Sequence, residues 1–251
     1  MTPPILWHFP GSHFNEKVRW ALDFKGIPHV RRALAFSYMP RALWRTGQGR
    51  LPVLMLEGKA IGDSTRIIEA LERVRPDPPL YPRNDSARRR ALLLEDFFDE
   101  EVGPAVRAFY VHELFVRSPD LAVDFFALGH GPGHRRVLRI MLPLLQKLYR
   151  RRHDVSAATA RAGRGRVLAA LDRIEAEVQP SGYLVGDGFT VADLTAAALL
   201  GIAADPADLQ YPLPRPVWIL ELRDSLAGRA GFQWIAEIYR RHRGTSMEVA
   251  A

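Results

Sequence analysis

Three polar residues stand where the sequence predicts that helices begin: Ser12, Asp63 and Ser64. Serine and aspartate are favoured at the N-cap, where the side chain accepts a hydrogen bond from a backbone N–H group of the first turn. The same end of a helix presents free N–H groups and the positive end of the dipole, which favour an anion. Each serine could therefore cap its helix or donate its hydroxyl proton to an anionic group, and the sequence leaves both roles open.

The chain contains no cysteine, which removes several kinds of chemistry. It has no thiolate nucleophile, no CxxC redox pair and no cysteine-ligated zinc or iron–sulfur cluster. Carboxylates that could form a metal site are Glu95, Asp96, Asp99, Glu100 and Glu101. No metal is expected there, because no histidine lies at ligand spacing and charged helix faces are usually solvated. His130 and His134 flank a Gly-Pro-Gly turn, which we interpret as a loop before a helix rather than a metal site.

Composition and charge indicate an ordinary globular protein. The 251 residues are 47% hydrophobic and 25% charged. No apolar run approaches the ~18 residues of a membrane span, and the first residues lack a signal-peptide pattern, so we expect a cytoplasmic protein. Residues 131–166 hold 10 Lys and Arg against one acidic residue. We interpret this segment as a solvated helix face and loop, because few aromatic residues accompany it, and we expect neither nucleic acid nor a membrane as a partner.

The first eighty residues alternate strand and helix patterns. Short apolar runs bounded by Pro, Gly or charged residues indicate strands, and apolar residues at helical spacing indicate helices. The stretch 35–50, which contains Pro40, Gly47 and Gly49, is expected to be a loop. The expected elements are a strand at 5–9, a helix at 13–25, strands at 29–34, 53–56 and 60–61, and a helix at 64–74.

Beyond residue 84 the strand patterns nearly vanish. Residues 75–82 are rich in proline, which continues neither a helix nor a strand, so they form a predicted linker. The expected helices cover 86–110, 134–153, 166–178, 190–202, 218–226 and 232–243, while 111–133 is left unassigned. The fold class is therefore an α/β domain, residues 1–80, followed by an all-α domain, residues 81–251, in which 81–85 completes the linker.

This layout resembles that of the cytosolic glutathione S-transferase family, and four local patterns carry the resemblance. Phe9 to Gly26, with the letters KVRWALDFKG, is similar to the family's first strand, turn and helix. The letters GRLPV at 49–53 resemble a loop whose proline is held cis, and GDSTRI at 62–67 resembles the start of the following helix. The letters YLVGDGFTVAD at 183–193 resemble a capping-box helix start in the second domain. Their order implies a thioredoxin-like βαβ-ββα domain followed by a helical domain.

The resemblance also implies a reaction. It indicates a serine-type glutathione transferase, similar to bacterial members, with glutathione as co-substrate and with no metal or prosthetic group. A free thiol has a pKa near ~8.5, so a hydroxyl donor at a helix N-terminus is needed to favour the thiolate. Ser12 is the expected catalytic residue, which holds the thiolate for attack on a small hydrophobic electrophile. His13 and Asn15, in the same turn, are the alternative contacts to the sulfur, or else solvated residues of the first helical turn, and a homodimer is expected.

Five further residues are expected to bind glutathione. Leu51 precedes Pro52 and pairs its backbone with the cysteinyl backbone of the tripeptide. Ser64 and the N–H groups of its helix take the γ-glutamyl carboxylate, while Asp63 faces the ammonium group. Arg50 is the candidate for the glycyl carboxylate.

A second substrate is expected between the two domains. The candidate walls of its pocket are Phe109, Tyr110, His112, Phe115 and Trp218, with a place in the core as the alternative for most of them. The alternative function is a binding or scaffold protein that keeps this fold without turnover. The unusual turn Gly-Ser-His-Phe-Asn and the basic segment 131–166 favour that alternative.

Overall fold

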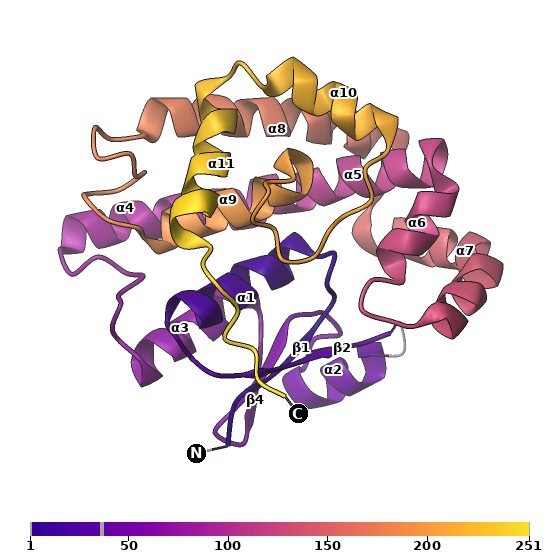
Figure 1. Ribbon diagram of the computed structural model, residues 1–251, viewed down its shortest axis with the longest axis horizontal. Helices are drawn as coiled ribbons and strands as arrows, with labels where there is room; N and C mark the ends of the chain where they lie inside the picture. Colours follow the sequence, from indigo (N-terminus) through magenta and orange to yellow (C-terminus); the bar gives the residue numbers. More distant parts are fainter. Residues whose placement is uncertain (1, 36–37, 251) are drawn as a thin grey trace.

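The computed structural model describes residues 2–35 and 38–250, and within them a small mixed sheet lies beneath a bundle of helices (Figure 1). The strands are β1 (Ile5–His8), β2 (Val30–Ala33), β3 (Val53–Leu56) and β4 (Lys59–Gly62). They are ordered β2-β1-β3-β4, and β1 runs parallel to β2 and antiparallel to β3. The thioredoxin-like module that the sequence predicts is therefore confirmed, with its two main helices, α1 (His13–Phe24) and α3 (Ser64–Val74), in place.

The prediction of a loop at 35–50 is wrong, because helix α2 (Tyr38–Thr46) occupies most of it. Pro40 lies in the first turn of α2, where a missing N–H group costs no intrahelical hydrogen bond. Gly47 follows the last helical residue with φ of 75°, a conformation that glycine adopts readily. The sequence conceals this helix because most of its large apolar side chains are exposed; these are Met39, Leu43 and Trp44.

The second part of the chain is helical throughout, as predicted. Its elements are α4 (Asp85–Asp96), the π-helical η1 (Phe97–Val102), α5 (Gly103–Arg117), α6 (Pro119–Phe126), α7 (Pro132–His153), α8 (Ala157–Glu177), α9 (Val191–Ala204), α10 (Val217–Leu226) and α11 (Ala230–His242). The unassigned stretch 111–133 becomes the end of α5 and all of α6. Helix α8 begins earlier than predicted because Ser156 and Thr159 form a capping box at its start.

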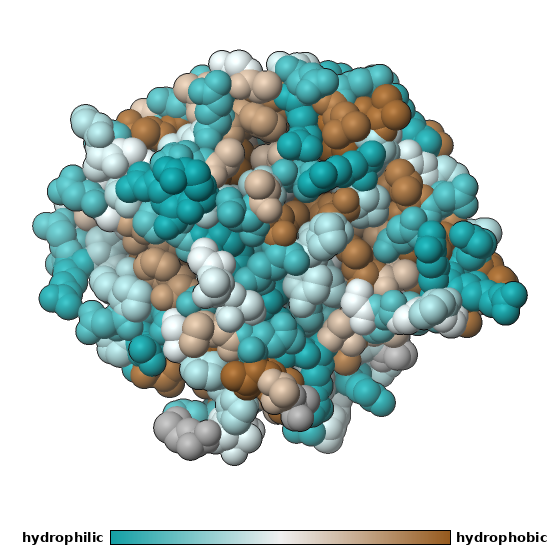
Figure 2. All heavy atoms as spheres, viewed as in Figure 1, coloured by the Kyte–Doolittle hydropathy of each residue, from teal (hydrophilic) through white to brown (hydrophobic). Residues whose placement is uncertain are grey.

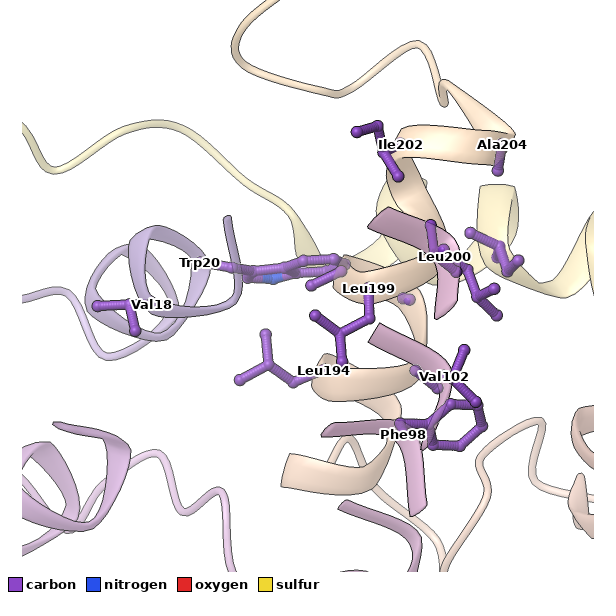
Figure 3. Packing of buried hydrophobic residues seen from close by; sticks show 14 of the residues in the cluster. Val18, Trp20, Phe98, Val102, Leu194, Leu199, Leu200, Ile202 and Ala204 are labelled. Carbon is purple, nitrogen blue, oxygen red and sulfur yellow. The ribbon is translucent and has the colours of Figure 1, made fainter. Parts of the chain in front are cut away.

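The core joins the two parts through α1 and α9. Trp20 on α1 is fully buried and points toward Leu194 and Leu199 of α9 (Figure 3). Its indole N–H donates to the carbonyl oxygen of His242 at 2.9 Å, so the end of α11 is held against α1 as well. Every residue of α9 is buried, which explains why its sequence is apolar on all sides.

The C-terminal segment returns to the sheet, as the yellow chain in Figure 1 shows. Arg243 is buried and donates to Glu16 at 2.6 Å and to Asp23 at 2.9 Å, and both carboxylates belong to α1. The N–H group of Met247 donates to Asp23 at 2.8 Å, and that of His29 donates to the carbonyl oxygen of Met247 at 3.2 Å. The tail therefore forms an isolated β-bridge with His29, just before β2, and ties the two parts together.

On the face drawn in Figure 2, hydrophilic side chains predominate and hydrophobic ones form small separate patches. None of the helices in the described ranges, 2–35 and 38–250, has the length and apolar character needed to cross a membrane.

Candidate functional site

A polar cavity of about 440 Å³ lies where the sheet meets the helices. It gathers five of the predicted site residues, which are Arg50, Leu51, Pro52, Asp63 and Ser64. These positions meet because β3 and β4 form a hairpin in which Val53 lies opposite Gly62, so the residues that flank the hairpin lie side by side. The opposite wall comes from η1 and the start of α5, which contribute Asp99, Glu100, Pro104 and Arg107.

The hairpin side of the cavity has the geometry that the resemblance implies. The Leu51–Pro52 peptide bond is cis. Asp63 has φ of 75°, and its Oδ1 accepts hydrogen bonds from the N–H groups of Thr65 and Arg66 at 3.1 and 3.2 Å. Asp63 is therefore the N-cap of α3, and Ser64 is buried at the start of the same helix. The carboxylate of Asp63 remains exposed at the cavity, so capping and contact with a ligand are compatible.

A buried ion cluster supports the floor of this cavity. Lys17 is fully buried on α1, and its ammonium group donates to Asp99 at 2.5 Å and to Glu95 at 2.8 Å. The hydroxyl of Thr65 donates to the same carboxylates at 2.8 and 3.1 Å. Burial alone would lower the pKa of Lys17, but the two carboxylates outweigh it and raise that pKa above its ordinary value. Two carboxylates of the acidic cluster that was predicted to be solvated, Glu95 and Asp99, are thus turned inward. They join α1 and α3 to the helical part.

A second, smaller cavity of about 110 Å³ adjoins the first and has mostly apolar walls. Ser12, His13 and Asn15 line it, and Phe14, Arg50, Leu51 and Arg107 line both cavities. Ser12 is the residue before α1, but its side chain makes no capping hydrogen bond. Its hydroxyl is therefore not committed to the helix and lies at the positive end of the α1 dipole.

The other two residues of the turn are engaged in the fold. His13 is buried, and its Nε2 lies 3.0 Å from the carbonyl oxygen of Gly103 on α5. Burial and the charge of Arg107 lower the pKa of His13 to about 3, so the ring is neutral and donates from Nε2. Asn15 is buried, and its Oδ1 accepts a hydrogen bond from the N–H group of Phe9 at 3.2 Å. Both side chains thus shape the turn that presents Ser12.

Arg107 is a site residue that the sequence analysis did not identify. It projects from α5 to the boundary of the two cavities, and its guanidinium carbon lies 5.8 Å from the centre of the Phe14 ring. The sequence carried a signal, because Arg107 is the one charged residue within the run GPAVRAFYV at 103–111. A single arginine in an otherwise apolar helical run indicates a buried or functional charge.

The candidate walls of the second-substrate pocket do not line the cavity beside Ser12, and the alternative of a core position is correct for Phe109, Tyr110, Phe115 and Trp218. Phe109, His112 and Trp218 line a different cavity, between α5, α8 and α10. Tyr110 and Phe115 are buried in the core. The walls beside Ser12 instead come from Phe9, Phe125, Phe126 and Tyr149, of which the last three belong to α6 and α7. Phe125 and Phe126 lie in the stretch that has no predicted element, so the sequence does not place their rings.

Two domain families match the chain. Residues 6–79 match "Glutathione S-transferase, N-terminal domain", and residues 156–235 match "Glutathione S-transferase, C-terminal domain". Both matched regions correspond to the fold described above: the first spans β1 to the end of α3, and the second spans α8 to α11.

Individual relatives are distant. The chain is 27% identical to FtsZ-localized protein A of Caulobacter vibrioides over 202 residues. This match covers 78% of this chain and 75% of that protein. The solved structure named FzlA from C. crescentus is 25% identical, with a TM-score of 0.58, and covers 93% of this chain and 92% of its own. A glutathione S-transferase of Methylobacterium radiotolerans, solved with glutathione sulfonate, has 24% identity, a TM-score of 0.56 and coverages of 92% and 93%. The last likeness concerns the fold alone.

Proposed function

We propose a binding role for this chain, which belongs to the glutathione S-transferase family. In this proposal the protein holds glutathione in the polar cavity and acts through what it binds, without conjugating glutathione to an electrophile. The observation that carries the proposal is the contrast between the two cavities. About 440 Å³ is open beside Pro52 and Ser64, but only about 110 Å³ is open beside Ser12.

The volumes favour binding over conjugation. Pockets that enclose ligands of drug size measure about 300–1,000 Å³, and the polar cavity falls within that range. The smaller cavity lies below it, and below the ~150 Å³ of an engineered cavity that holds benzene. Packed aromatic rings narrow the cavity beside Ser12. The centre of the Phe9 ring lies 5.3 Å from that of Phe125 and 5.9 Å from that of Phe126. A larger electrophile would have to displace these rings to reach Ser12.

A titration calorimeter tests the first half of the proposal. Reduced glutathione should bind with a dissociation constant between about 1 μM and 1 mM, which corresponds to about 4–8 kcal/mol. Ser64→Ala should weaken binding by about tenfold, because it removes a buried hydroxyl beside the cavity. Ser86→Ala is the matched control, since Ser86 also lies in the first turn of a helix but is exposed and does not line the cavity. Equal affinities for the two variants would remove Ser64 from the proposed site.

A protein partner is the second half of the proposal. FtsZ is the first partner to test, because FtsZ-localized protein A matches this chain over most of its length. The purified protein should co-sediment with FtsZ of Caulobacter vibrioides polymerised with GTP, and should stay in the supernatant when GDP replaces GTP. The Methylobacterium radiotolerans relative serves as a control for the fold. Equal sedimentation of both proteins would reject FtsZ as the specific partner.

A second candidate function is glutathione transfer, and one observation favours it. The hydroxyl of Ser12 makes no capping hydrogen bond although it stands at the start of α1. A serine whose sole role were capping would accept a bond from the first turn. Under this candidate, Ser12→Ala would slow conjugation of a chlorodinitrobenzene at least tenfold and leave the affinity for glutathione unchanged. A rate equal to the uncatalysed background in the unsubstituted protein would exclude it for that electrophile.

A further inference from the structure

We propose that the smaller cavity binds a monocarboxylate with a short chain or a single ring as its body, and that Arg107 is its anchor. The inference rests on the proposed function only in that this ligand and glutathione share one cleft. It concerns a residue and a ligand class that the resemblance to the transferase family does not supply.

Arg107 is a half-buried arginine that pairs with no carboxylate of the described residues. Its Nε is enclosed, and within the described residues, 2–35 and 38–250, no hydrogen bond or ion pair engages its guanidinium group. Burial and the charge of Arg50 lower the pKa of Arg107. A partly enclosed charge that lacks an ionic partner is a candidate for binding a ligand of opposite charge.

Other enclosed cations of this chain differ from Arg107. Lys17 contacts two carboxylates, Arg243 contacts two, and Lys25 lies 2.6 Å from Glu72. Arg19 contacts Glu16 at 2.8 Å. The fold therefore pairs the cations that it uses for structure, and Arg107 stands outside that pattern.

The described walls of the smaller cavity carry basic side chains and no acidic ones. The described residues that line the smaller cavity include no aspartate and no glutamate, whereas Arg50 and Arg107 both line it. His153 lines it as a neutral ring, because burial and the nearby arginines Arg107, Arg152 and Arg50 lower its pKa to about 3. The potential in this cavity is positive, and an anion is the ligand that it favours.

Two phenol groups share the smaller cavity with the guanidinium group. Tyr149 and Tyr38 both line the cavity. Burial raises the pKa of Tyr149 to about 12 and raises that of Tyr38, so both phenols keep their protons and can donate. An arginine fork with two adjacent O–H donors suits the two oxygens of a carboxylate, each of which accepts up to two hydrogen bonds.

The volume sets the size of the ligand. About 110 Å³ is less than the ~150 Å³ that holds a benzene molecule, so the enclosed part of the ligand is a few carbon atoms or one ring that reaches toward the opening. The rings of Phe125 and Phe126 provide apolar contact for that body. Val111 and Ile202 add further apolar surface to the same cavity.

The test is a calorimetric titration of the full chain with butyrate and benzoate, each compared with its neutral amide. Both carboxylates should bind at least tenfold more tightly than butyramide and benzamide, because the amides carry no charge for Arg107. Arg107→Gln should weaken carboxylate binding by about tenfold or more. Arg136→Gln, which removes an exposed arginine of α7, should leave it unchanged. Arg107→Gln should also melt at the same temperature as the unsubstituted protein or higher without ligand, since it removes an uncompensated charge.

Carboxylates that bind no better than their amides to the unsubstituted protein would overturn the inference, and this comparison needs no variant. Equal carboxylate binding by Arg107→Gln would overturn it as well. If Arg107→Gln weakens glutathione binding while neither carboxylate binds at all, Arg107 serves glutathione, and the inference fails although the proposed function stands. If the carboxylates bind through Arg107 and glutathione does not bind, the proposed function fails and the inference stands.

Discussion

Replacing Lys17 by methionine should destabilise the protein severely, because it removes one partner of a buried ion cluster. The ammonium group is fully enclosed and contacts Asp99 at 2.5 Å and Glu95 at 2.8 Å. Breaking a buried pair from one side costs about 3–5 kcal/mol, since the carboxylates stay buried without a counter-charge. For a chain of this length each kcal/mol shifts the melting temperature by about 2–4 °C, so a decrease of about 6–20 °C is expected.

The assay is thermal unfolding followed by circular dichroism, with Lys59→Met as the matched control. Lys59 is an exposed lysine of β4, so its replacement should change the melting temperature little. Adding Glu95→Gln to Lys17→Met should recover part of the loss, because one unpaired carboxylate is removed. Because the pKa of Lys17 is raised, its contribution is fully present below the ordinary lysine value near ~10.4, so the effect should not diminish as pH rises from about 7 to 9. A decrease no larger than that of the control would refute the reasoning.

Two further predictions concern the ion pairs of Arg243 with Glu16 and Asp23, and the contact of α8 with α5. Burial alone would raise the pKa of Glu16 and of Asp23, but Arg243 and its neighbours lower both. The two ionised carboxylates therefore stabilise the fold above their ordinary pKa values, and this stabilisation is lost as the pH falls. The melting temperature should decrease below about pH 4, and it should decrease less in Arg243→Met. Gly163→Ala should cost about 1–3 kcal/mol, because its Cβ would lie 2.4 Å from a carbonyl oxygen of α5. Gly165→Ala, in the same helix but facing open space, should instead stabilise by about 0.5–1 kcal/mol; equal effects in urea unfolding would contradict this packing.

The fold could be predicted from the sequence where the signals are local. The capping box of α9 is an example: Thr190 and Asp193 stand three residues apart, and the structure contains the reciprocal hydrogen bonds. The strands were found because short apolar runs end at turn residues. Helix α2 was missed for a local reason too, since it keeps Met39 and Leu43 at the surface and so lacks the buried face that reveals a helix.

The site could be predicted only in part, because its chemistry depends on contacts between distant segments. The residues around Pro52 and Ser64 were found through the resemblance, and a β-hairpin brings them together. Lys17 and Glu95 lie 78 positions apart, and no periodicity in the sequence connects them. Arg107 faces residues from α1, α2 and α7, so its role appears only when the helices are placed.

The central claim is that this member of the family binds glutathione without transferring it, and the conjugation rate at saturating glutathione tests it most directly. The rate should be measured with a chlorodinitrobenzene and with an unbranched aliphatic electrophile, after calorimetry has given the saturating concentration of glutathione. The account predicts saturable binding and a rate equal to the background without protein, for the chain as it stands and for Ser12→Ala alike. A rate well above background that falls at least tenfold in Ser12→Ala would contradict the account, because the cleft beside Ser12 would then admit and convert a second substrate.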